Sequence, residues 1–193
     1  MGKNLEEKRQ LILDYDQVFV ERLTIKIFKK PQLSIWMILI PIIFIFFFQQ
    51  VTKYKNDKKD FIKNYLLSPN RALNEAYEAI KQKREFNVEP MVEMADLKSH
   101  SIDPYRELMS ILTQHYTNLL NAKGEKFGDL ILSAYPKKTQ YLLMIDDINN
   151  AWRSLNQTIV QDLAKTTPAA ADTVRKIEDS SMEIRNVDIK AFY

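Results

Sequence analysis

The 193-residue chain contains no cysteine, only three glycines and only two histidines. The absence of cysteine excludes a disulfide scaffold, a thiolate metal site, an iron–sulfur cluster and a cysteine nucleophile. Three glycines are too few for phosphate-binding loops, Rossmann turns and tight β-hairpins. A strong charge of one sign is also lacking, because 28 basic and 25 acidic side chains leave a net charge of +3. We therefore expect no nucleic acid among the partners.

Patterns typical of catalytic sites are equally scarce. The histidines, His100 and His115, are accompanied neither by a G-x-S-x-G nucleophile elbow nor by the paired Glu-x-x-His motifs of di-iron bundles. The most suggestive metal-ligand pattern consists of four residues at steps of four, three and four: Glu89, Glu93, Asp96 and His100. Pro90 interrupts this pattern, and a solvated acidic face that ends in a histidine explains it better. Asp146 and Asp147 would point about 100° apart on a helix, so they cannot form a close acid–base pair. We expect no enzymatic activity, no metal and no cofactor.

One long apolar run dominates the sequence. The sixteen residues from Leu33 to Phe48 carry no charge. Extended to residues 31–51, the run would form a helix about 30 Å long, which matches the hydrocarbon thickness of a bilayer. Apolar side chains on every face favour a membrane span over a buried core helix. The sequence predicts one transmembrane helix over residues 33–51, with membrane-spanning positions that include Leu33, Trp36, Pro41, Phe44 and Phe48.

Basic and aromatic side chains border this run and are expected at the membrane–water interface: Lys29, Lys30, Lys53, Tyr54 and Lys55. A cleaved signal peptide is disfavoured, because 32 residues precede the run and no A-x-A-like site follows it. A re-entrant hairpin centred on Pro41 would account for the positive charge on both flanks. Its two arms would have only about eight residues each, which is short for such a structure. A single-pass anchor is the preferred interpretation.

The orientation of the anchor is less strongly determined by the charges. The lysines and arginines within about 15–20 residues of the run slightly favour a cytoplasmic C-terminal domain. A cytoplasmic N-terminus, by contrast, avoids translocating residues 1–32, which hold seven basic and five acidic side chains. We expect the N-terminus to be cytoplasmic and the C-terminal domain to lie on the opposite side, as in a signal-anchor protein.

Residues 1–32 form a charged amphipathic segment before the anchor. Apolar side chains recur there at helical spacing and share one face: Leu11, Ile12, Tyr15, Phe19, Leu23 and Ile27. Acidic residues lie towards its start and basic residues towards its end, which complements a helix dipole. Such a helix either lies on anionic headgroups or against a partner helix, or packs on its own neighbours. A short strand around residues 24–27 is the alternative.

Beyond the anchor we expect a basic stalk over residues 52–68 and a water-exposed α-helical domain over residues 69–193. Prolines punctuate the domain and favour helix starts near residues 69, 104 and 168, while Gly124 is placed to end the second helix in a left-handed cap. Residues 130–132 are apolar enough for a strand, but no partner strand is evident. The predicted fold class is all-α: a juxtamembrane helix, one transmembrane helix, and a soluble antiparallel bundle of four to five helices.

The clearest periodicity in that domain has alternating steps of four and three residues: Tyr141, Ile145, Ile148, Trp152, Leu155 and Ile159. Such a stripe is either the inner face of a bundle or an interface for another chain. The run covers fewer than three heptads, so a free-standing coiled coil would be weak. An intramolecular core is the preferred interpretation.

Two functional hypotheses remain. The first is an accessory, scaffolding or assembly subunit of a membrane-associated complex, whose partners are the lipid bilayer, other membrane or envelope proteins and, in a homo-oligomer, further copies of the chain. It predicts exposed apolar side chains on the bundle. The second is a membrane-anchored sensory module with a small molecule held between helices. It predicts an enclosed pocket of roughly 300 Å³ or more.

Overall fold

The protein is described by a computed structural model that covers residues 2–27, 57–163 and 170–193. Within these residues every regular element is a helix, which confirms the predicted all-α class: α1 Leu5–Ile27, α3 Asp57–Tyr65, α4 Leu67–Gln82, α5 Glu89–Glu93, α6 Ser99–Asn121, α7 Phe127–Ala134, α8 Lys138–Leu163 and α9 Ala170–Phe192. The predicted transmembrane helix over residues 33–51 lies outside the described residues. Among the helices that are described, none has the length and apolar character needed to cross a bilayer.

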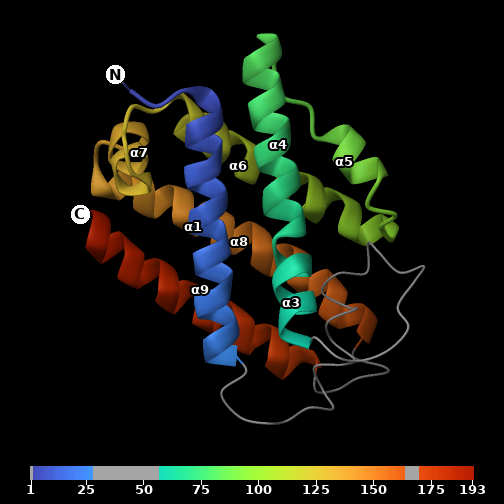
Figure 1. The fold of residues 1–193 in the computed structure, drawn as a ribbon. Coiled ribbons are helices and arrows are strands. Elements are labelled where there is room, and N and C mark those ends of the chain that lie inside the picture. The colour runs from blue at the N-terminus through green and yellow to red at the C-terminus, as the bar shows by residue number, and fades with distance from the viewer. Residues whose placement is uncertain (1, 28–56, 164–169) are drawn as a thin grey trace.

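The long helices are arranged in two layers (Figure 1). Helices α6, α8 and α9 are successive neighbours, and the chain runs in opposite directions along each adjoining pair. Helices α1, α3 and α4 lie across them, and α6 contacts both α1 and α4. The antiparallel arrangement expected from the sequence therefore holds for α6, α8 and α9, whereas α1, α3 and α4 add a second, crossing layer.

Helix α1 is an integral part of this body. Its side chains Ile12, Val20, Leu23 and Ile27 are at most 1% exposed. Burial of an aliphatic side chain contributes about 1.5–3 kcal/mol, so these four contribute roughly 6–12 kcal/mol before entropic costs. That is comparable with the net stability of an entire domain, about 5–15 kcal/mol. Of the two interpretations of the N-terminal helix, the structure therefore shows the one in which it packs on its own neighbours.

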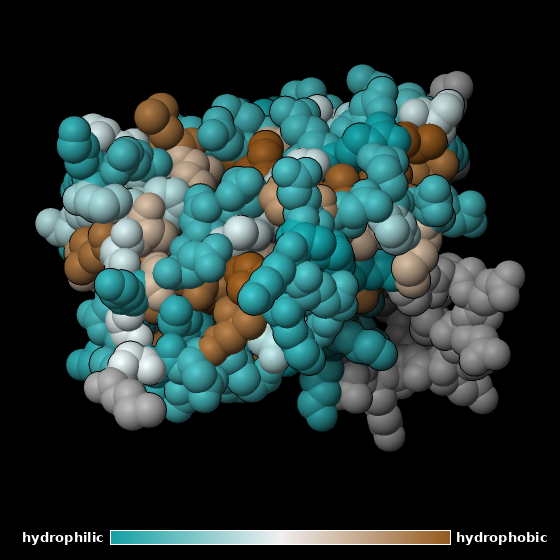
Figure 2. Space-filling view, turned by 90° about the horizontal axis from the view of Figure 1, so that it is seen from above, coloured by the Kyte–Doolittle hydropathy of each residue, from teal (hydrophilic) through white to brown (hydrophobic). Residues whose placement is uncertain are grey.

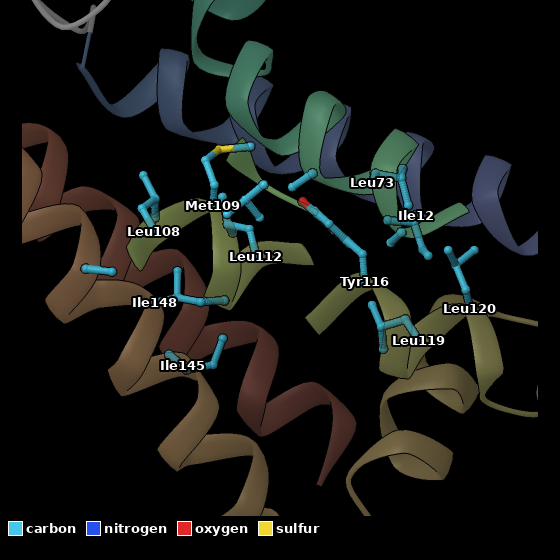
Figure 3. Packing of buried hydrophobic residues seen from close by; sticks show 14 of the residues in the cluster. Ile12, Leu73, Leu108, Met109, Leu112, Tyr116, Leu119, Leu120, Ile145 and Ile148 are labelled. Carbon is cyan, nitrogen blue, oxygen red and sulfur yellow. The ribbon is translucent and has the colours of Figure 1, made fainter. Parts of the chain in front are cut away.

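The main core lies between α1, α4, α6 and α8. Ile12 of α1 and Leu73 of α4 lie side by side, facing Tyr116 and Leu119 of α6 (Figure 3). The stripe predicted on residues 141–159 is the inner face of α8. Five of its six side chains are at most 7% exposed, and Trp152 is partly buried against the same cluster. This face is occupied by the chain's own helices.

A second, separate core cluster joins α1 to α3 and α9. We call it the base cluster; it comprises Phe19, Val20, Leu23, Ile27, Phe61, Tyr65, Leu66, Ile177 and Ile184. Phe61 and Tyr65 belong to the region expected to be a basic stalk. From Asp57 onward that region is instead helical, and Phe61 is only 1% exposed. The helix that follows the apolar run is thus packed into the body.

Several local predictions differ from the observed helices. Helix α6 begins at Ser99, so Pro104 lies inside it, where only one hydrogen bond near the helix start is lost. Gly124 has no left-handed backbone; its hydrogen permits a close approach, because a Cβ there would lie 2.5 Å from the Cβ of Asp129. The apolar residues 130–132 belong to α7. The start of this helix is stabilised because the Asp129 carboxylate accepts hydrogen bonds from the backbone N–H groups of residues 125 and 126.

The surface of the described body is mostly polar. Figure 2 shows one face on which hydrophilic side chains predominate and hydrophobic ones occur in small separate groups. The large apolar side chains with most exposure include Leu143 of α8, at 65%, and Val187 of α9, at 58%. Isolated exposed apolar residues are common on proteins, and most of the large apolar side chains of the described residues are at least partly buried between the layers.

Replacing Leu23 by alanine tests whether α1 belongs to the fold. We expect Leu23→Ala to lower the free energy of unfolding by about 2–5 kcal/mol, because it opens a cavity in the base cluster. The matched control is Ile25→Ala on the same helix, where the side chain is 62% exposed and the expected change is within about 0.5 kcal/mol. Urea unfolding of the full chain in mild detergent, followed by circular dichroism, measures both. Equal values for the two variants would show that α1 is not docked.

Candidate functional site: the base of the helical body

The base is the end of the body where α1 finishes and α3 and α9 begin (Figure 1). The described chain stops at Ile27 on one side of the apolar run and resumes at Asp57 on the other. The predicted membrane-spanning and interface residues all fall between these points, outside the described residues. The structure does describe the end of α1 and the start of α3, which precede and follow the run in the sequence. The base cluster contains the buried apolar side chains of this region.

Polar contacts reinforce the base cluster. The ammonium group of Lys26 lies 2.6 Å from a carboxylate oxygen of Glu183, and this contact holds the pKa of Glu183 below its usual value. Lys176 of α9 donates a hydrogen bond of 3.0 Å to the backbone oxygen of Ile27. The last carbonyls of a helix lack partners within it, and a cation there also complements the helix dipole. Helix α9 thus satisfies the end of α1 directly before the apolar run.

Asp188 of α9 contacts α1 at two positions nearer the start of that helix. Its carboxylate accepts hydrogen bonds from Arg22, at 2.6 Å, and from the hydroxyl of Tyr15, at 2.7 Å. Asp188 is only 7% exposed, so an unpaired charge there would be costly. Removing either donor would leave a buried carboxylate short of partners. Register between α1 and α9 is therefore specified by charge as well as by apolar packing.

A small cavity of about 70 Å³ lies directly behind the base cluster. Most described helices contribute to its wall, and aromatic rings dominate the lining: Tyr15, Phe19, Tyr65, Tyr116, Phe127, Tyr141 and Trp152. The rings of Tyr65 and Trp152 stack with their centroids 5.8 Å apart. The Arg185 guanidinium lies 5.2 Å from the centre of the Phe19 ring, a cation–π distance. Asp16 is the one carboxylate among the lining residues.

The Asp16 carboxylate has an unusual environment. Its Oδ2 accepts a hydrogen bond of 2.7 Å from the hydroxyl of Tyr116. The residue keeps part of its surface exposed, but protein atoms crowd the carboxylate and withdraw it from water, which raises its pKa to about 7. The hydrogen bond and the positive charge of Arg185 act in the opposite direction and offset only part of this effect. Asp16 is therefore poised between its two protonation states near neutral pH.

His115 of α6 borders the same cavity. Its Nδ1 lies 2.8 Å from the hydroxyl oxygen of Tyr135. Burial lowers the pKa of His115 to about 3, and the charge of Arg185 adds to the shift. The imidazole is therefore neutral at physiological pH, which suits a core hydrogen-bonding role.

The residues considered earlier for metal binding do not converge. Glu89 pairs with Arg106 at 2.7 Å, and His100 lies 3.2 Å from Asp162. Helix α5 ends at Glu93 and α6 begins at Ser99, so the pattern is not on one continuous helix. In the described part of the chain, no three potential ligands are grouped as a metal site would require. Asp146 and Asp147 are exposed on α8.

Sequence reasoning missed Asp16 and Asp188, although a signal for both is present. Asp16 lies four residues after Ile12 and three before Phe19, inside the apolar stripe of α1. Asp188 lies four residues after Ile184 in the same way. A carboxylate at a core position of an amphipathic helix predicts a buried partner, which here is a tyrosine or arginine on another helix.

Replacing Asp16 by asparagine tests the burial of its carboxylate. The ordinary pKa of about 4 in the unfolded chain is below the folded value, so the folded chain binds an extra proton between roughly pH 4 and pH 7. Wild-type stability therefore falls as the pH rises through this window, and Asp16→Asn removes that loss. The stability of the variant relative to wild type should increase by at least about 1 kcal/mol from pH 5 to pH 8. Urea unfolding at both pH values measures it, and the exposed Asp147→Asn is the control. Parallel profiles would contradict the prediction.

Replacing His115 by glutamine should change the acid side of the profile in the opposite sense. The folded pKa of His115 is depressed, so the unfolded chain binds the extra proton between about pH 6.5 and pH 3. Wild-type stability is lost as the pH falls through this window, and His115→Gln should flatten that part of the curve. Unfolding at pH 6.5 and pH 4.5 provides the comparison, with the exposed His100→Gln as control. A variant as sensitive to acid as the wild type would refute the assignment.

No family model, no curated protein and no solved structure matches this chain. The functional argument therefore depends on the residues of the chain and on the geometry of its base.

Proposed function

We propose that the protein is an accessory or scaffolding subunit that its apolar run attaches to a membrane. The base supports this proposal, because α1 and α3, the described helices that precede and follow the run in the sequence, are both held in the folded body by buried contacts. The apolar run supplies the affinity for lipid, because an apolar segment of this length without charges is more stable in hydrocarbon than in water. A body attached in this way is held at a defined position at the bilayer, as a scaffold requires.

The exposed side chains of the body offer contacts for protein partners. Leu143 borders an open groove between α6 and α8 with a volume of about 680 Å³. Val187 on α9 is 58% exposed. Isolated apolar side chains are common on protein surfaces, so the groove beside Leu143, rather than these side chains by themselves, supports the proposal of a protein partner.

The alternative of a sensory module with a bound small molecule has weaker support. The cavity behind the base cluster has a volume of about 70 Å³, compared with the 300 Å³ or more that a drug-sized ligand occupies. It has room for a few water molecules at roughly 10–15 Å³ each. Polar atoms of Asp16 and Arg185 are suitable partners for such waters.

Two lysines placed in the apolar run test the membrane attachment. Each lysine at the centre of a bilayer costs about 2.5–3.5 kcal/mol, so Ile40→Lys combined with Ile43→Lys should shift the protein from the membrane pellet to the supernatant after carbonate washing. The control carries Leu143→Lys and Val187→Lys on the exposed surface of the body and should remain in the pellet.

The same membranes test the accessory role. After gentle detergent extraction, the wild type and the surface control are purified and their co-eluting proteins are quantified. The proposal expects a stoichiometric partner with the wild type and less of it with the surface control. Wild-type protein that carbonate removes from membranes contradicts the attachment, and a monomer without any partner contradicts the accessory role.

A further inference from the structure

Residues before and after the apolar run share one folded body. Leu23 and Ile27 of α1 belong to the same cluster as Phe61 of α3 and Ile184 of α9. Lys26 and Glu183 add an ion pair across the same contact. Groups in direct contact must lie on the same side of any membrane. The fold therefore constrains the topology of the apolar run, provided that this run enters a membrane as proposed above.

The length of the connection between α1 and α3 limits how often the chain can cross the bilayer between them. Residues 28–56 comprise 29 residues between α1 and α3. One helical crossing uses about 20 of these residues, which leaves about nine for the way back. Nine fully extended residues reach about 30 Å at most, so they would have to cross the hydrocarbon without internal hydrogen bonds. That return segment would also carry Lys53 and Lys55. A crossing followed by a return would therefore need a second span that a connection of this length does not supply.

We propose that α1 and the rest of the described body lie on one side of the membrane to which the apolar run attaches the protein. The lysines on both flanks fit this topology, since both flanks then meet one headgroup layer: Lys29, Lys30, Lys53 and Lys55. Both orientations of a single-pass anchor place α1 and the C-terminal domain on opposite sides of the membrane. The same-side topology differs from both of them and agrees with the re-entrant alternative. The base of the body is then the end that faces the lipid.

The absence of cysteine makes a direct test possible. Single cysteines are placed at two exposed positions, Val18→Cys on α1 and Leu143→Cys on α8, which are 51% and 65% exposed in the native protein. A membrane-impermeant maleimide is added to sealed right-side-out and inside-out vesicles that contain the full chain. We expect both cysteines to be labelled in the same vesicle type and both to be protected in the other. A buried control, Leu108→Cys, should react only after denaturation.

Labelling of the two positions in opposite vesicle types would overturn the same-side topology while leaving membrane attachment intact. Extraction of the wild type by carbonate would overturn both the proposed function and this inference. The two failures are therefore distinguishable.

A second measurement tests whether α1 is docked on α9 when the protein is bound to membranes. The pair Lys26→Cys and Glu183→Cys replaces the ion pair at the base, and a short bifunctional maleimide should link the two positions in intact membranes. The matched control combines Lys26→Cys with Asp147→Cys on exposed α8 and should give no intramolecular link. Absence of the link in the first pair, with both cysteines reactive, would show that α1 separates from α9 in the membrane.

Discussion

Helix α1 reaches the rest of the molecule only through a connection of 29 residues, so its place in the fold is maintained by noncovalent contacts with α3, α4, α6 and α9. Ordering the ends of a long connection carries an entropic cost, although this cost grows only slowly with length. Four aliphatic side chains that are almost fully buried offset it. The geometry of the base and the same-side topology proposed from it both depend on this docking.

Charged groups give that docking its specificity. An apolar helix face alone tolerates small sliding movements, because neighbouring apolar side chains are similar in size and chemistry. Asp188 accepts hydrogen bonds from two different residues of α1, and Asp16 accepts one from Tyr116 of α6. A shift of one turn would leave these carboxylates without partners in a poorly hydrated environment. The buried acids therefore fix one register of α1.

Much of the helical content could be predicted from the sequence, because apolar spacing reports on the local face of a helix. The stripe from Tyr141 to Ile159 and the face of α1 both follow this rule. The assembly of the faces could not be predicted in the same way. Spacing does not indicate that α1 packs on α9, which is more than 140 residues away, or that residues 57–65 join the body. The position of Gly124 in the sequence favours a helix cap, whereas its role in the folded chain is a close approach to Asp129.

The division of the apolar interior into two clusters affects how the molecule can unfold locally. Proteins open locally in cooperative units, and units with fewer buried contacts open at lower free energy. The base cluster is the smaller of the two. Local opening of α3 and of the C-terminal part of α1, which supply most of its residues, need not disrupt the packing of α4 against α6 and α8. If the apolar run enters a bilayer as proposed above, that attachment would restrain the two helices whose contacts make up most of the smaller cluster.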